Sequence, residues 1–262
     1  NDLESIKCAN ITADVKDNEF NVHPFYNILT LNYKDSLLKV SIIVPTLNEA
    51  QVLNETLTQI RQLCPHELVV SDGGSDDNTL EIAEKFTEHI VKGSAGRALQ
   101  MNAGTRIATG DIFLFLHADS RIEPNSYEKM LHSLKSSEKI GGAFSFCIDS
   151  DKWSLRLITR LANLRSKYLG MAYGDQAFFV KNSKFQQMDG FTEFPICEDI
   201  DFFKRLRKLG PVIILKEKAF TSPRRWMQEG IWFTTLRNIL IATLFELGFP
   251  PRILTKWYQA IR

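Results

Sequence analysis

The sequence predicts an α/β protein in which a mixed sheet is flanked by helices and followed by a helical C-terminal appendage. Short β-branched and aromatic runs alternate with helix-forming stretches, a pattern typical of βαβ units with parallel strands. The expected strands lie near 40–44, 67–71, 90 and 112–116, and the helices between them near 50–62, 77–86 and 96–108. Three of these strands end in polar or acidic loops, which an open α/β sheet gathers at its carboxyl edge, where ligands bind.

The second half of the chain continues this alternation before it becomes helical. The expected helices are 123–134, 153–169 and 198–209, the expected strands are 141–146, 177–180 and 212–215, and helical patterns run from 228 to 245 and from 251 to the end. We therefore expect one domain over residues 39–226, a helical segment over 227–262 packed on or beside it, and an N-terminal extension over 1–38 without an assigned role.

Composition narrows the classes of function. The 262 residues are 44% apolar and 24% charged, as in ordinary globular proteins, and the net charge of +1 argues against a nucleic-acid partner. The four cysteines form no CxxC, which argues against a zinc site or a disulfide framework. No signal peptide or bilayer-length apolar run is visible, so we expect a cytoplasmic protein, either free or peripheral on the cytoplasmic membrane face.

The loop at 72–77 (Asp-Gly-Gly-Ser-Asp-Asp) follows the second strand. Its later residues are good helix N-cap chemistry, so we expect Asp76 or Asp77 to cap the next helix. Asp72, at the strand tip, is expected to face the ligand and to accept a hydrogen bond from a base N–H or a ribose hydroxyl. Asn48 and Glu49 offer similar acceptors at the neighbouring tip.

The segment His117-Ala118-Asp119 is the candidate metal site. Alternation along an extended segment places the side chains of His117 and Asp119 on one side. A carboxylate beside an imidazole suits Mn²⁺ or Mg²⁺, which in turn neutralises phosphate oxygens. We interpret Asp119 as the metal ligand and His117 as a hydrogen-bonded strand-end side chain. Arg97, in a basic glycine-bearing loop that opens a helix, suits an anion, although a solvated basic turn is an equally simple interpretation.

These motifs, taken in order, resemble the family-2 glycosyltransferases of GT-A fold, which use nucleotide sugars and invert the anomeric centre. The matching segments are 41–49 (Ser-Ile-Ile-Val-Pro-Thr-Leu-Asn-Glu), 69–77, 96–97 with 102–104, and 116–119, followed by Gly141-Gly142, Gly174-Asp175 and Glu198-Asp199. The resemblance covers about residues 40–226. It implies a GT-A-like nucleotide-binding sheet.

The resemblance also implies roles for individual residues. The nucleotide would be bound by Pro45, Thr46, Asn48, Glu49, Asp72, Arg97 and Ala118. Asp119 would hold the metal and diphosphate, and the catalytic pair would be Glu198 and Asp199, with Asp199 as the base. Without the resemblance, this pair is explained equally well as acidic residues favoured in a first helical turn. The residues that would contact the diphosphate and the acceptor are Arg224, Arg225, Trp226, Gly142 and Asp175.

The implied function is metal-assisted, inverting transfer of a sugar from a nucleoside diphosphate sugar, with a UDP-sugar favoured, to an unidentified acceptor hydroxyl. Two alternatives remain: a nucleotidyltransferase, which would show a glycine- and arginine-rich loop early in the chain, and a non-catalytic protein that binds sugar nucleotides. A dinucleotide-dependent oxidoreductase is disfavoured because no GxGxxG follows the first strand.

The helices at 153–169 and beyond 228 combine apolar residues at helical spacing with basic residues. They could pack entirely on the sheet and on each other. The alternative is an exposed surface for a membrane or for a second copy of the chain, which would present a lipid-linked or otherwise amphipathic acceptor.

Overall fold

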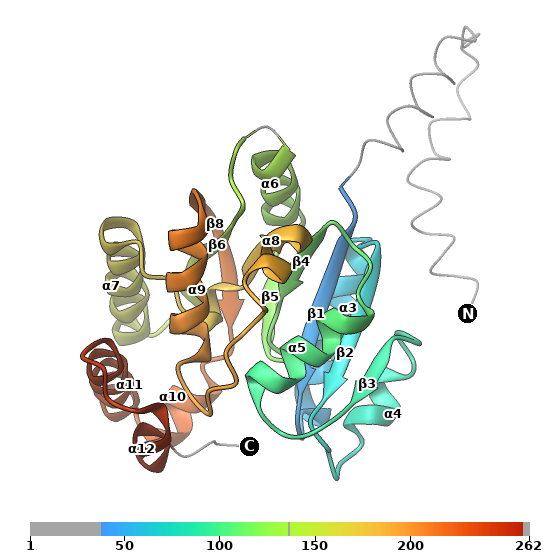
Figure 1. Cartoon of the computed structure of the whole chain (residues 1–262). Coiled ribbons are helices and arrows are strands. Elements are labelled where there is room, and N and C mark those ends of the chain that lie inside the picture. The colour runs from blue at the N-terminus through green and yellow to red at the C-terminus, as the bar shows by residue number, and fades with distance from the viewer. Residues whose placement is uncertain (1–37, 136, 259–262) are drawn as a thin grey trace, which may run out of the picture. The chain divides into compact units, whose positions relative to one another are not determined.

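The structure, a computed structural model, describes residues 38–135 and 137–258 (Figure 1). Residues Lys39–Arg262 form one compact unit, so the C-terminal helices belong to the same unit as the sheet. The N-terminal extension expected at 1–38 lies outside the described residues, apart from Leu38.

The core of this unit is an eight-stranded mixed sheet in the order β3-β2-β1-β4-β7-β6-β8-β5. Its strands are β1 (Val40–Thr46), β2 (Glu67–Asp72), β3 (Ile90–Lys92), β4 (Ile112–Phe115), β5 (Ser120–Ile122), β6 (Gly141–Ile148), β7 (Phe178–Lys181) and β8 (Val212–Thr221). Strands β1 to β4 are mutually parallel, as predicted, because helices link them and carry the chain back to the same edge. Their carboxyl ends therefore meet.

The other half of the sheet contains antiparallel pairs and differs more from the prediction. Strand β5 was not predicted, because its three residues are too short to show a period. Strand β8 runs six residues past the expected end at Leu215 and pairs with β5 through Thr221 and Ser120. This pairing carries the chain to the loop that holds Asp119, where the backbone N–H of Ser222 donates to the carbonyl of Asp119 (3.2 Å).

The helices follow the predicted order with three differences. They are α3 (Ala50–Gln62), α4 (Thr79–Ala83), α5 (Arg97–Ile107), α6 (Pro124–Lys135), α7 (Trp153–Leu169), α8 (Asn182–Gln187), α9 (Glu198–Leu209), α10 (Arg224–Glu229), α11 (Ile231–Glu246) and α12 (Pro251–Leu254), with short 3-10 turns at Gly174–Gln176 and Thr255–Trp257. Helix α4 is shorter than expected and α8 was not predicted. The helix expected over 228–245 is divided at Gly230, whose φ of 99° favours glycine and breaks the helical path.

An aromatic core joins the sheet to α5, α8 and α9, which lie in front of it in Figure 1. Phe115 of β4 meets Phe191 edge to face at 4.9 Å, and Phe191 stacks on Phe202 of α9 at 4.1 Å between ring centroids. Offset and edge-to-face rings of this kind add to the burial of apolar area. This packing fixes α9, whose first turn carries Glu198 and Asp199.

Within the described part of the chain, no helix is both long and apolar enough to cross a bilayer. Among the described residues, Cys147 and Cys197 are free thiols.

Candidate active site

A first cavity, here called the strand-tip cavity, opens where the parallel strands end. It is lined by Pro45, Thr46, Leu47, Glu49, Gly96, Gln100, Ala118, Pro195, Arg224 and Thr255, together with five residues described below. The structure thus brings together five predicted nucleotide-binding residues, Pro45, Thr46, Glu49, Arg97 and Ala118.

Gln100 of α5 forms hydrogen bonds to the ends of two neighbouring strands. This role was not predicted from the sequence. The side-chain N–H group of Gln100 donates to the carbonyls of Thr46 (2.6 Å) and Ser71 (3.1 Å), while its Oε1 accepts from the backbone N–H of Gly96 (3.2 Å). Gln100 lies 54 residues along the chain from Thr46 and 29 from Ser71, so no local sequence pattern predicts these bonds. They set the shape of the cavity floor.

Asp72 and Asn48 line neither cavity; they hold the loops behind the first one. Asp72 is buried and accepts backbone N–H groups of Gly74 and Ser75 at 2.9 and 2.8 Å. Asn48 Oδ1 accepts the Asp76 N–H (2.9 Å). Their nucleotide-binding roles remain predictions.

Asp77 supplies the predicted bond to the start of the helix, although the N-cap position of α4 is Asn78. The Asp77 carboxylate accepts the backbone N–H of Thr79, the first residue of α4, at 3.0 Å. It also accepts the N–H of Ala50 at the start of α3 (3.2 Å). One side chain therefore satisfies free backbone donors of two helices.

A second cavity, here called the helix-side cavity, lies between α9, α10 and α11. Its further lining residues are Tyr173, Asp175, Ile196, Cys197, Asp199, Ile200, Thr221, Ser222, Trp226, Asn238, Ile241 and Ala242. Asp199 is oriented by the backbone N–H of Gly174, which donates to its Oδ2 at 2.7 Å. A Cβ on Gly174 would lie 3.2 Å from that oxygen, so glycine permits this close approach.

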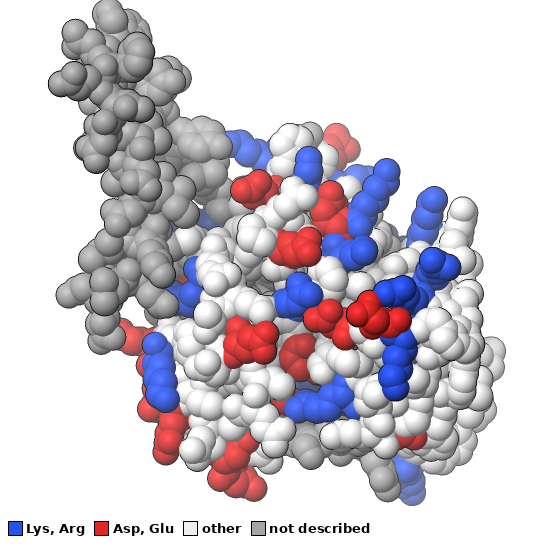
Figure 2. All heavy atoms as spheres, turned by 180° about the vertical axis from the view of Figure 1, so that it is seen from behind, with Lys and Arg blue, Asp and Glu red and all other residues white. Residues whose placement is uncertain are grey.

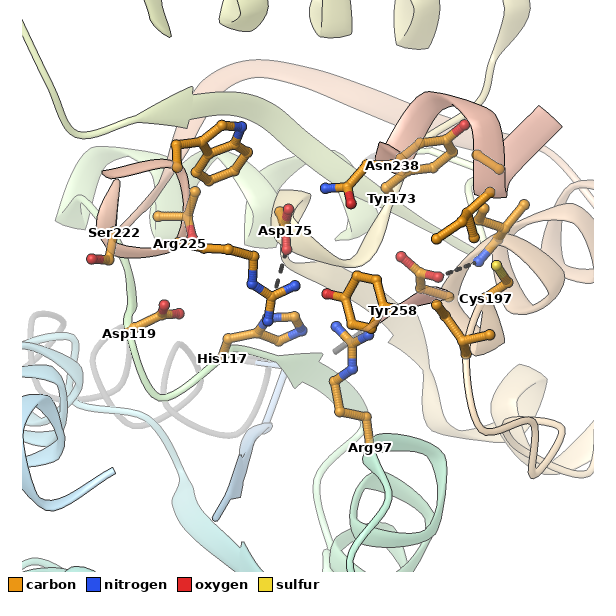
Figure 3. Close-up of a pocket in the computed structure, with 17 residues that line it drawn as sticks. Arg97, His117, Asp119, Tyr173, Asp175, Cys197, Ser222, Arg225, Asn238 and Tyr258 are labelled. Carbon is orange, nitrogen blue, oxygen red and sulfur yellow. Dashed lines mark hydrogen bonds and ion pairs between the residues drawn. The ribbon is translucent and has the colours of Figure 1, made fainter. Parts of the chain in front are cut away.

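Five residues line both cavities and mark their junction: Arg97, His117, Asp119, Arg225 and Tyr258. Figure 3 shows these side chains on α5, on the loop between β4 and β5, on α10 and just after the C-terminal 3-10 turn, with Tyr258 in the middle. His117 Nδ1 lies 3.8 Å from Asp175 Oδ1. Burial lowers the pKa of His117, with Asp175 opposing that effect. The junction thus combines two permanent cations with one carboxylate, Asp119.

The predicted Arg224-Arg225-Trp226 motif spans both cavities. Arg224 pairs with Glu49 at 2.9 Å on the strand-tip side, while the indole of Trp226 lies in the helix-side cavity. The middle residue reaches the junction, where its guanidinium lies 4.9 Å from the centroid of the Tyr258 ring. Gly142, in contrast, lines neither cavity. A Cβ there would lie 2.0 Å from the Ile213 carbonyl, so its place in β6 is explained by strand packing.

Glu198 lies behind the junction and holds Arg97. Its side chain is only 2% exposed, and its Oε1 lies 2.9 Å from Arg97 Nε. The Glu198 carboxylate raises the pKa of Arg97, so the guanidinium stays cationic even though burial opposes it. Glu198 does not line either cavity, whereas its neighbour Asp199 does.

We expect Glu198→Gln to destabilise the fold by about 1–3 kcal/mol, because it leaves the Arg97 cation without its partner in a mostly buried site. The penalty is limited since 35% of the Arg97 side chain still meets water. Urea unfolding followed by circular dichroism measures the change. Glu55→Gln on the exposed side of α3 is the matched control and should shift stability by less than about 0.5 kcal/mol. Equal shifts would contradict the positioning role of Glu198.

Helix α11 borders the helix-side cavity and is held there by a buried ion pair. Arg237 donates to both carboxylate oxygens of Glu229 at 2.9 and 2.6 Å, and both side chains are 10% exposed. Burial opposes ionisation of Glu229, but these bonds outweigh it and lower the pKa of the carboxyl group. The pair fixes the rotation of α11, so that Asn238 and Ile241 line the cavity.

Two polar atoms in this cavity wall are candidates for ligand contacts. Among the described residues, neither Trp226 Nε1 nor Asn238 Oδ1 has a hydrogen-bond partner, and both atoms are buried. A buried polar group without a partner costs free energy. Burial also raises the pKa of nearby Tyr173, whose phenol therefore remains a hydrogen-bond donor. No sequence pattern singled out Asn238, Tyr173 or Tyr258.

A divalent cation fits one position in this site. The described residues contain no group of three His, Cys, Asp or Glu side chains that could hold a metal by themselves. Mg²⁺ and similar ions are often held by one or two carboxylates together with substrate phosphates. Asp119 at the junction, beside Arg97 and Arg225, offers one such carboxylate.

Two joined cavities at the carboxyl edge of an α/β sheet, with cations at their junction, define a site for an anionic ligand and a second ligand beside it. The chain belongs to Glycosyl transferase family 2, whose model matches residues 41–192. The family resemblance read from the motifs is therefore confirmed. The match ends before Asp199 and before the C-terminal helices.

Curated relatives match shorter segments. A PGL/p-HBAD biosynthesis glycosyltransferase of Mycobacterium bovis is 44% identical over 91 residues, which are 31% of this chain and 36% of the relative. A dolichol-phosphate mannosyltransferase of Pyrococcus furiosus is 30% identical over 112 residues, 39% of this chain and 32% of the relative. The matches thus span only about a third of each relative's length.

Solved structures confirm the fold class over more of the chain. The mannosyltransferase PcManGT of Pyrobaculum calidifontis, in complex with GDP-Man and Mn²⁺, superposes with a TM-score of 0.60 at 21% identity, over 82% of this chain and 66% of that one. S. aureus TarS 1-349 in complex with UDP-GlcNAc superposes with a TM-score of 0.56 at 19% identity, over 71% and 58%. The expected GT-A-like mixed sheet is therefore confirmed.

Proposed function

We propose that this chain is a glycosyltransferase that moves a sugar from a nucleoside diphosphate sugar to an acceptor hydroxyl with inversion. The observation that carries the proposal is the junction of the two cavities, where Arg97, Asp119 and Arg225 face both sides. A donor whose nucleoside lies in the strand-tip cavity would place its diphosphate at this junction. Its sugar would then face the helix-side cavity.

The donor side supplies shape and charge. Thr46, Pro45 and Ala118 form the wall for the nucleoside, and Arg97 and Arg225 meet the diphosphate. The family membership and the neighbours with bound UDP-GlcNAc or GDP-Man support a nucleotide-sugar donor, and we favour a UDP-sugar. Asp119 would hold Mn²⁺ or Mg²⁺, which supplies charge neutralisation at the diphosphate when bound.

The acceptor side supplies a base. Asp199 lines the helix-side cavity and is held by the N–H of Gly174, so its carboxylate has one orientation. It would take the proton of the acceptor hydroxyl as that oxygen attacks the anomeric carbon and the nucleoside diphosphate leaves. A single in-line displacement of this kind inverts the anomeric configuration. Arg97 and Arg225 stabilise the negative charge that grows on the departing diphosphate.

The acceptor cavity combines polar and apolar walls. Tyr173, Asp199 and Asn238 are among its polar lining residues, while Ile196, Ile241 and Ala242 offer apolar contacts. We therefore propose an acceptor with at least one hydroxyl and an apolar portion. A lipid-linked alcohol has this chemistry.

A panel of UDP- and GDP-sugars, scored for release of the nucleoside diphosphate with Mn²⁺ and with chelator, tests the proposal. We expect release with at least one donor and loss of release with chelator. Release of pyrophosphate instead would identify a nucleotidyltransferase. Tight donor binding without any release, for every donor in the panel and with a set of alcohol acceptors present, would identify a non-catalytic binder.

A further inference from the structure

Helix α7 exposes an apolar stripe beside a basic one. The apolar stripe consists of Trp153, Leu157, Leu161, Leu164 and Tyr168, which follow at intervals of three or four residues and are 38–72% exposed. Arg156, Arg160 and Lys167 follow the neighbouring line of the helix and are also exposed, and Arg156 pairs with Asp151 just before the helix. The segment 152–169 contains five Lys or Arg residues and no Asp or Glu. The helix therefore presents apolar groups and positive charge to the same side.

Helix α11 continues the apolar stripe of α7. Trp232, Leu236, Ile239 and Leu240 are each at least half exposed and occupy positions i, i+4, i+7 and i+8. The rings of Trp153 and Trp232 lie 6.3 Å apart between centroids, and the two helices are in contact. We call the two stripes together the apolar face.

The opposite side of α11 is covered by the rest of the protein, because Thr234, Ile241 and Ala242 are buried there. Contiguous exposed apolar surface of this extent marks an interaction site more often than a free surface. Figure 2 shows a broad surface with few charges on the right of the view, with Lys and Arg side chains along it.

We propose that the apolar face docks on an anionic lipid surface. The tryptophans suit the boundary between headgroups and acyl chains, the leucines and isoleucine suit the outer acyl region, and the basic stripe of α7 suits anionic headgroups. A pair of helices lying in this plane binds reversibly, so the docking needs no membrane-spanning segment.

Charge decides between a lipid surface and a second copy of the chain. A two-fold dimer places the same patch on both sides of the interface. Such an interface would bring the basic stripe close to its own symmetry copy, and like charges repel. An anionic membrane offers the opposite charge over its whole surface. The charge pattern therefore favours lipid as the occupant.

Docking in this way would bring the helix-side cavity to the membrane. The same helix, α11, carries the apolar face on one side and the cavity residues Asn238, Ile241 and Ala242 on another. A lipid whose hydroxyl extends past α11, one helix diameter (~10 Å) beyond the apolar face, would then reach Asp199. This last step rests on the proposed function, whereas the docking itself does not.

Flotation assays with two kinds of vesicle test the docking. One kind contains phosphatidylcholine alone, and the other also contains about 30% phosphatidylserine. We expect binding to the anionic vesicles, with a blue shift of tryptophan fluorescence. Leu161→Glu and Leu236→Glu should each lower the partition coefficient at least about tenfold. Ile107→Glu is the matched control, since Ile107 is 41% exposed on α5, and it should bind like the wild type.

The basic stripe has its own test. Arg160→Gln with Lys167→Gln should lower binding to anionic vesicles about tenfold or more while leaving the weak binding to neutral vesicles unchanged. Absence of binding to either vesicle would overturn the proposal. So would a dimer by light scattering that Leu236→Glu dissociates, because the face would then be a subunit interface. Donor turnover without vesicles reports on the catalytic proposal separately.

Discussion

Asp199→Asn is expected to lower kcat about 10²–10⁴-fold with little change in donor affinity, because it removes a positioned base but keeps the shape of the side chain. The side chain lines the acceptor side of the site, and the N–H of Gly174 holds it at 2.7 Å. The asparagine amide can still accept this bond through its oxygen. Steady-state kinetics over a range of donor concentrations, combined with calorimetric donor binding, measures both quantities.

Asp201→Asn provides the matched control. Asp201 lies in the same first turn of α9 but lines neither cavity, and it pairs with Arg205 (2.8 Å) and Thr192 (2.7 Å). Its loss should reduce stability slightly and leave kcat within a few-fold. If Asp199→Asn weakens donor binding and leaves kcat intact, Asp199 is a binding residue and Asp175 becomes the better candidate base.

The positions of the strand ends were predictable because they follow from the topology of parallel strands. Parallel strands joined by helices must all end at one edge, so Thr46, Ala118 and Asp119 were expected near one another, and the structure brings them into one cavity. This topology does not determine which polar side chain at a tip faces outward. Asp72 forms hydrogen bonds within its own turn. The sequence of this loop is equally compatible with an Asp72 that faces the ligand and with one that faces its own turn.

The acceptor side was less predictable because distant segments build it. Tyr173 follows α7, Asn238 lies on α11, and Tyr258 lies near the end of the described chain, so no spacing links them. In the antiparallel half of the sheet, strands β6, β7 and β8 were predicted at 141–146, 177–180 and 212–215, but β5 was missed for a related reason. Strand β5 has three residues, and it is a strand only because β8 extends far enough to pair with it.

Helix α7 shows where a sequence pattern remains ambiguous. Apolar residues at helical spacing predict a buried stripe, and on α7 they include both buried Leu155 and Ile158 and exposed Trp153 and Leu161. Both sets have helical periodicity. Only the position of the helix relative to the sheet decides which stripe is covered, and that depends on contacts made elsewhere in the chain.

Asp119→Asn is expected to reduce turnover at least about 10²–10³-fold, the cost typical of removing one group that stabilises charge in the transition state. The reason is its position: the side chain lines both cavities at the point where Arg97 and Arg225 also meet. If Asp119 holds a divalent cation against the diphosphate, the loss of its charge should weaken binding of a nucleoside diphosphate far more than binding of the nucleoside. Calorimetry with UDP and uridine, each with Mn²⁺ and with chelator, measures this difference without turnover.

Asp149→Asn separates this effect from a general loss of negative charge. Asp149 is an exposed carboxylate that pairs with Arg121 at 3.2 Å and lines neither cavity, so its replacement should leave the UDP and uridine affinities unchanged. In the wild type, chelator should reduce UDP affinity toward that of uridine, and in Asp119→Asn chelator should have little further effect. Full turnover in Asp119→Asn, or in the wild type with excess chelator, would contradict the metal role. A diphosphate held by Arg97 and Arg225 alone would then be the simpler arrangement, because two guanidinium groups already supply the charge that a phosphate pair requires.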